Sequence, residues 1–174
     1  MKFHKTTISD CLRIELEKRG DDRGFFARLF CEEEFSFAGY PLEIVQANDS
    51  FSADLGTLRG MHYQIGDSEE TKVIRCLMGA IYDVVLDLRP NSPSYRKWEG
   101  FYLDSDNRSM IRVPKGCAHG FLTMKSNTEV FYLVDSFYNP NAEHGVRWND
   151  EKFGIIWPNE PRVLSDKDAN WPDF

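Results

Sequence analysis

The sequence lacks the features that mark several large classes of protein. Its four cysteines, Cys11, Cys31, Cys76 and Cys117, form no C-x-x-C pair, which argues against a zinc site and against a disulfide framework. No apolar run approaches the roughly 20 residues that a spanning helix needs, and the first residues lack the apolar core of a signal peptide. Acidic residues outnumber basic ones by 28 to 21, which gives a net charge of −7. We therefore expect no nucleic acid and no membrane as partner, and a cytoplasmic location.

The 174 residues contain no internal repeat and no Ser/Gly-rich linker, which predicts one domain spanning residues 1–174. Alternating apolar and polar residues, bounded by turn residues, predict strands at 72–77, 81–88, 98–103, 109–113 and 129–134. Only two short helices are expected, at 31–35 and 165–168. Many short strands with few helices predict an all-β sandwich or barrel, with a jelly roll as the leading form.

Two histidines stand beside glycines in a chain that has only four histidines. Residues 58–64 read Leu-Arg-Gly-Met-His-Tyr-Gln, and residues 114–121 read Pro-Lys-Gly-Cys-Ala-His-Gly-Phe. Imidazoles on neighbouring strands predict a pocket for proton chemistry or for an anionic ligand. Strand alternation places Gly60, His62 and Gln64 on one face and Arg59, Met61 and Tyr63 on the other. The residues alone leave open a second interpretation, in which His62 is a core histidine bonded to a backbone carbonyl.

Other residue types fit the same pocket. The Pro-x-Gly-x-x-His of residues 114–119 is similar to a motif of metal-binding cupins, whose first motif contains His-x-His. Here that place reads His62-Tyr63-Gln64, and an amide and a phenol replace imidazole poorly on a transition metal, so we expect a cupin-shaped barrel without a metal. A diphosphate could be bound by five cations: Arg23, Arg28, Arg59, Lys72 and Lys167. The alternative is that these side chains are solvated surface charges. One carboxylate of residues 166–168 could orient His62, or could merely cap a turn.

Ordered motifs along nearly the whole chain resemble the dTDP-4-dehydrorhamnose 3,5-epimerase family. They include Asp22-Arg23-Gly24-Phe25-Phe26, Gln46-Ala47-Asn48-Asp49-Ser50, both histidine segments, Lys72, Tyr132, Tyr138-Asn139-Pro140, residues 143–148 and residues 165–168. The resemblance implies a jelly-roll cupin, a homodimer and a cofactor-free epimerase. Its substrate would be a nucleotide-diphosphate 4-keto sugar, usually 6-deoxy. By the same resemblance His62 is the base, Asp168 orients it, Tyr132 is the acid and Lys72 stabilises the enolate. The implied substrate contacts are Arg23, Gln46, Asn48, Arg59, His119, Tyr138, Glu143 and Lys167, with Tyr138 stacking on the nucleobase.

The residue types suit this chemistry, because a 4-keto group acidifies the hydrogens at C3 and C5 and a nearby ammonium stabilises the resulting oxyanion. The chain departs from the family at Arg28, where a glutamate is expected, and at Ser136-Phe137, where an acidic-aromatic pair is expected. Arg28 counts among the expected substrate contacts and makes GDP- or CDP-linked sugars, including heptoses, alternatives to a dTDP-linked one. Other open alternatives are a 3-epimerase, a ketoisomerase, a metal-dependent cupin enzyme and a non-catalytic nucleotide-sugar-binding cupin.

Overall fold

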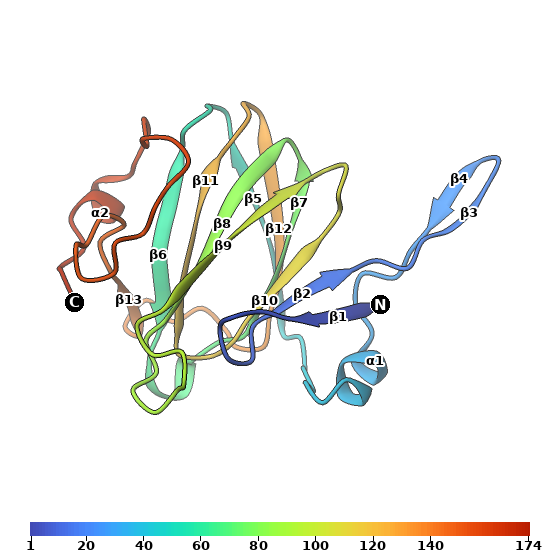
Figure 1. Ribbon diagram of the computed structural model, residues 1–174, viewed down its shortest axis with the longest axis horizontal. Coiled ribbons are helices and arrows are strands. Elements are labelled where there is room, and N and C mark those ends of the chain that lie inside the picture. The colour runs from blue at the N-terminus through green and yellow to red at the C-terminus, as the bar shows by residue number, and fades with distance from the viewer.

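Two antiparallel sheets face each other in the computed structural model, which describes all 174 residues (Figure 1). The first sheet has the strand order β1 (Lys2–Lys5), β2 (Leu12–Glu15), β10 (Met110–Val113), β7 (Lys72–Met78), β12 (Thr128–Val134) and β5 (Gln46–Ser52). The second has the order β13 (Glu143–Gly145), β6 (Leu58–Gln64), β11 (Cys117–Thr123), β8 (Ala80–Asp87) and β9 (Trp98–Asp104). Helices are few and short: α1 (Glu32–Phe37), α2 (Asp166–Ala169) and a 3₁₀ turn at Gly66–Ser68. The architecture confirms the all-β prediction.

The main core lies between the two sheets. Ile74 of β7 and Val130 of β12 pack with Ile81 of β8 and Phe121 of β11, and all four are nearly inaccessible to solvent. Burying each such side chain contributes about 1.5–3 kcal/mol. Alternation along β8 sends its other residues to the outer face, where Val84 and Leu86 join a second cluster beneath the chain that follows β13. A third cluster, centred on Phe35 of α1, covers part of the first sheet. The cavity described below therefore has two rigid walls.

The positions of most predicted strands agree with the structure to within two residues, and the corrections have physical causes. Residues 78–80 do connect two strands, but β7 and β8 belong to different sheets, so the turn crosses the sandwich instead of closing a hairpin. The helix expected at 165–168 is α2, and Ser165 is its N-cap, whose Oγ accepts from Asp168 N at 3.1 Å. His119 lies within β11, which begins at Cys117.

The alternation expected along β6 is wrong at Arg59. His62 lies opposite His119, but Arg59 lies opposite Phe121, so the register shifts between them and Arg59 and His62 face the same cavity. An extra residue in one strand leaves two residues opposite one and reverses the alternation. Gly60 permits this bulge, because it has φ of 139° and a Cβ there would lie 2.5 Å from the Cα of Gly120. A histidine and an arginine three positions apart thereby share one face.

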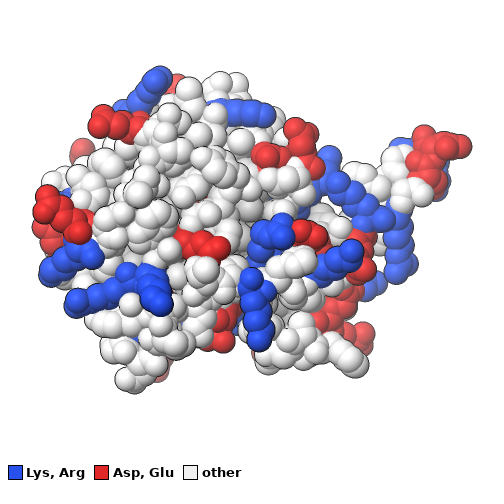
Figure 2. All heavy atoms as spheres, viewed as in Figure 1, with Lys and Arg blue, Asp and Glu red and all other residues white.

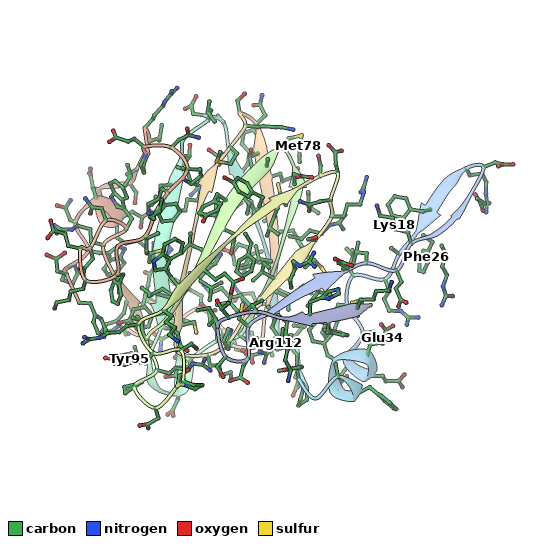
Figure 3. The ribbon with its side chains drawn as sticks, viewed as in Figure 1. Lys18, Phe26, Glu34, Met78, Tyr95 and Arg112 are labelled. Carbon is green, nitrogen blue, oxygen red and sulfur yellow. The ribbon has the colours of Figure 1, made fainter.

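A two-stranded hairpin of β3 (Arg19–Asp21) and β4 (Gly24–Phe26) projects away from both sheets (Figure 1). Figure 2 shows charged side chains of both signs on this projection, and Figure 3 marks Phe26 and Lys18 on it, outside the body of the sandwich. All its strand residues are exposed, including Phe25 and Phe26. The hairpin therefore contributes nothing to the core of its own chain.

Candidate active site

A cavity of about 580 Å³ opens between the two sheets, and we call it the main cavity. It adjoins a smaller hollow of about 260 Å³, here called the polar lobe. Three residues line both: His62, Lys72 and Tyr132. The main cavity is otherwise lined by Ser50, Thr57, Leu58, Arg59, His119, Phe121, Val130, Val163, Leu164, Ser165, Lys167 and Asp168. The polar lobe adds Gln46, Asn48, Tyr63, Gln64, Glu70, Tyr138 and Glu143. Residues from distant parts of the chain thus converge on one site.

His62 and Asp168 form a close pair although 106 positions separate them. His62 Nε2 lies 2.5 Å from Asp168 Oδ1, and the carboxylate side chain is 5% exposed. The short helix α2 packs against β6, and its Ser165 cap fixes the backbone of Asp168. Burial acts to raise the pKa of Asp168, but hydrogen bonds from His62 and Ser165 hold it below its ordinary value. Asp168 is therefore ionised at neutral pH and leaves Nδ1 as the ring nitrogen free for other chemistry.

A second histidine–carboxylate pair lies beside the first. His119 Nε2 lies 2.7 Å from Oδ2 of Asp83, a residue of β8 that is inaccessible to solvent. Asp83 Oδ1 has no hydrogen-bond partner. Asp83 was not among the residues predicted from the sequence. The available signal was a carboxylate between Ile81 and Val85 on one face of a strand, since a buried carboxylate is costly unless it is paired.

The wall opposite the histidines carries Tyr132 and Lys72. His62 and His119 belong to the second sheet, whereas Tyr132 on β12 and Lys72 on β7 belong to the first. Burial raises the pKa of the Tyr132 phenol, as does the charge of Glu70, while Arg59 lowers it. Tyr132 is therefore protonated at neutral pH. Lys72 Nζ forms an ion pair with Glu70 Oε1 at 2.9 Å. The cavity thus has an imidazole on one wall and a phenol with an ammonium on the other.

The polar lobe gathers most of the other predicted contacts. Tyr138 donates to Glu143 at 2.9 Å, and Lys167 donates to the other oxygen of Glu143 at 2.7 Å. Burial acts to raise the pKa of Glu143, but these two hydrogen bonds hold it below its ordinary value. Gln46 Nε2 donates to Asn48 Oδ1 at 2.8 Å on the neighbouring edge strand. The Tyr138 ring remains more than half exposed. This lobe offers amides, a carboxylate, an ammonium and an open aromatic face.

Arg59 lines the main cavity, whereas the predicted contacts Arg23 and Arg28 line neither the main cavity nor the polar lobe. Arg59 donates from Nε to Ser52 Oγ at 3.1 Å and from Nη2 to the Phe51 carbonyl at 3.0 Å. Arg23 lies on the projecting hairpin, 89% exposed and paired with Asp21. Arg28 follows the hairpin and pairs with Glu34 of α1 at 2.5 Å. Neither residue lines the cavity of its own chain.

No group of three or more His, Cys, Asp or Glu side chains is placed to hold a metal ion. No helix has the length and apolar character required to cross a bilayer.

Three comparisons with known proteins all identify sugar epimerases as the relatives of this chain. Residues 5–174 match the family described as dTDP-4-dehydrorhamnose 3,5-epimerase. The enzyme of that name from Escherichia coli K12 is 42% identical over 170 residues, which cover 97% of this chain and 91% of the relative. A Bacillus anthracis dTDP-4-dehydrorhamnose 3,5-epimerase with TDP and PPi bound superimposes with a TM-score of 0.96 at 42% identity, covering 99% of both chains. The 3'-monoepimerase ChmJ from Streptomyces bikiniensis, in complex with dTDP-quinovose, gives a TM-score of 0.90 at 32% identity, covering 98% and 86%. The similarity confirms the jelly-roll cupin fold.

Proposed function

The chain belongs to the dTDP-4-dehydrorhamnose 3,5-epimerase family and is a nucleotide-sugar epimerase, and from this premise we propose how its residues perform the reaction. His62 is the base that removes the proton from the carbon beside the ketone. The electron pair of the C–H bond moves to the keto oxygen and gives an enolate. Asp168 fixes the imidazole and stabilises the imidazolium that forms, since it is ionised and buried against Nε2.

Lys72 stabilises the enolate oxygen, and Tyr132 returns a proton to the carbon from the other side. An ammonium in a secluded cavity stabilises a developing oxyanion more than it stabilises a ketone, which lowers the barrier. Inversion requires the acid and the base to act on opposite faces of the sugar ring. The observation that carries this proposal is that His62 and Tyr132 come from opposite sheets and line the same cavity.

We assign the remaining contacts to the nucleoside diphosphate. Arg59 and His119 lie beside the reacting groups in the main cavity, where they suit a diphosphate or sugar oxygen. Gln46, Asn48, Glu143 and Lys167 surround the exposed ring of Tyr138, which suits a stacked base. Relatives of this chain are described with TDP or dTDP-sugar bound, so the proposed substrate is a dTDP-linked 4-keto-6-deoxy sugar. Residues from β5 to α2 build this one site, which supports a single catalytic domain over residues 1–174.

The active form we propose is a homodimer, in which the hairpin of one chain reaches the nucleotide of the other. Arg23 and Arg28 line neither hollow of their own chain, and the hairpin exposes Phe25 and Phe26. The outer face of the first sheet also has complementary charges. Phe131 lies between Arg75 on β7 and Asp49 on β5. Arg75 Nε is buried without a hydrogen-bond partner. A two-fold axis would bring the Arg75 of one copy to the Asp49 of the other.

Product stereochemistry tests the proposed function. The protein is incubated with dTDP-4-keto-6-deoxyglucose, and the product is identified by NMR. We expect inversion at C3 and C5. Inversion at C3 alone would assign the activity of the 3'-monoepimerase relative, and an unchanged sugar would contradict the proposal. A parallel thermal-shift series with dTDP, GDP, CDP and UDP identifies the base, because a ligand that binds the native state raises Tm according to its affinity.

A further inference from the structure

Glu70 is a largely buried carboxylate of the site that has no part in the chemistry described above. It precedes β7 by two positions and lines the polar lobe with Lys72 and Tyr132. Its side chain and that of Lys72 are 11% and 13% exposed, and the pair is 2.9 Å apart. Lys72 makes no other ion pair. A buried ammonium is costly unless it has a partner of opposite charge, so the position of Lys72 depends on Glu70.

The location of this pair matters because Lys72 lines both the main cavity and the polar lobe. A lysine side chain is flexible and places its charge precisely only when a partner restrains it. Glu70 approaches from the polar lobe and therefore restrains the ammonium at the boundary between the two hollows. That boundary is where His62 and Tyr132 also lie.

Glu70 also acts on Tyr132 through its charge. Burial is the main cause of the raised pKa of Tyr132, the negative charge of Glu70 raises it further, and Arg59 opposes both. Other charged or titratable groups line the two hollows around the phenol. They are His62 and Tyr63 on β6, Lys72 on β7, His119 on β11, Tyr138, Glu143 on β13, and Lys167 and Asp168 on α2. Among the carboxylates, Asp168 is bonded to His62, and Glu143 of the polar lobe is bonded to Lys167 and Tyr138.

We propose that Glu70 is a positioning residue of the epimerase, which holds the Lys72 ammonium at the reacting centre and whose charge, in the hollow that it shares with Tyr132, favours the acid form of that phenol. The inference rests on the proposed roles of Lys72 and Tyr132. No bond forms or breaks at Glu70. Its two effects are separable, because placing the ammonium requires only an acceptor oxygen, whereas the added preference of the phenol for its protonated form requires a negative charge.

Two variants separate these effects. Glu70→Ala removes the acceptor and releases Lys72, so kcat falls by about tenfold or more with little change in KM, since misplacing a group by about 1 Å can cost up to 100-fold. Glu70→Gln keeps an oxygen for the ammonium but removes the charge. Its kcat at neutral pH therefore stays within about threefold of wild type, while the alkaline limb of the pH–rate profile moves to lower pH.

Glu69→Gln is the matched control, because Glu69 carries the same charge one position earlier and lines neither hollow. It should leave kcat and the pH profile unchanged. Rates are followed as formation of the inverted sugar from dTDP-4-keto-6-deoxyglucose, which requires Lys72 and Tyr132, and Tm is recorded for each variant. An alkaline limb that stays in place in Glu70→Gln, or an unchanged kcat in Glu70→Ala, overturns the proposal. A wild-type protein that does not invert the sugar would contradict the proposed function instead, so the two failures are distinguishable.

Discussion

The pairing of Asp168 with His62 yields a prediction whose size follows from the structure. Asp168→Asn keeps the shape of the side chain and an oxygen near Nε2, but removes the charge that stabilises the imidazolium. The contact is 2.5 Å long and the carboxylate is 5% exposed, so little solvent screens it. A buried hydrogen bond to a charged group contributes about 1.5–3 kcal/mol, and that loss lowers the rate by a factor of about 10 to 160.

The assay is deuterium exchange from solvent into the 4-keto sugar, with kcat and KM measured separately. We expect the loss in kcat, because the imidazolium forms only as the proton is removed. Wild-type stability supplies a second readout. The pKa of Asp168 is lower in the folded protein than in the unfolded chain, so the pair stabilises the fold above about pH 4, and this contribution is lost as the pH falls through the folded pKa. The Asp168→Asn variant should lack that acid-dependent change in Tm. A variant with kcat within twofold of wild type would refute the reasoning.

Further predictions concern the acid, the base-stacking residue and the bulge. Tyr132→Phe should keep proton removal by His62, seen as deuterium exchange, while inversion falls by about 10²–10⁴-fold; full inversion by this variant would exclude Tyr132 as the acid. Tyr138→Ala should weaken nucleotide binding by about 1–3 kcal/mol, the typical contribution of base stacking, whereas Tyr138→Phe should keep most of it; calorimetry with dTDP would show equal losses if stacking were irrelevant. Gly60→Ala should destabilise the fold by about 1–3 kcal/mol, because its Cβ would meet the Cα of Gly120 at 2.5 Å; an unchanged Tm would contradict this account of the bulge.

The strand pattern, and most of the residues that line the two hollows, were predictable from the sequence. Alternation of apolar and polar residues is a local property, and it located β7, β8, β9 and β12. The contact between His62 and Asp168 is not local, and the residues alone offered it only as one of two alternatives. Resemblance to a family supplied the assignment, and the distance of 2.5 Å now places the two groups together.

The features that the sequence did not predict depend on packing between strands or, under our proposal, on a second chain. The bulge at Gly60 arises where β6 meets β11, so no periodicity within β6 could reveal that Arg59 and His62 share a face. The roles of Asp83 and Glu70 depend on their partners, the imidazole of His119 and the ammonium of Lys72, which only the fold places beside them. Arg23 and Arg28 were predicted from the sequence as substrate contacts, but neither lines the main cavity or the polar lobe of its own chain. Their role remains a proposal that depends on a homodimer.

Solvent exchange catalysed by wild type and by His62→Ala, measured side by side in D2O, tests the central claim most directly. NMR of dTDP-4-keto-6-deoxyglucose should show deuterium entering beside the ketone with the wild-type protein. The His62→Ala variant should be slower by about 10²–10⁴-fold at the same protein concentration. Equal rates of exchange for the two proteins would contradict the assignment of His62 as the base.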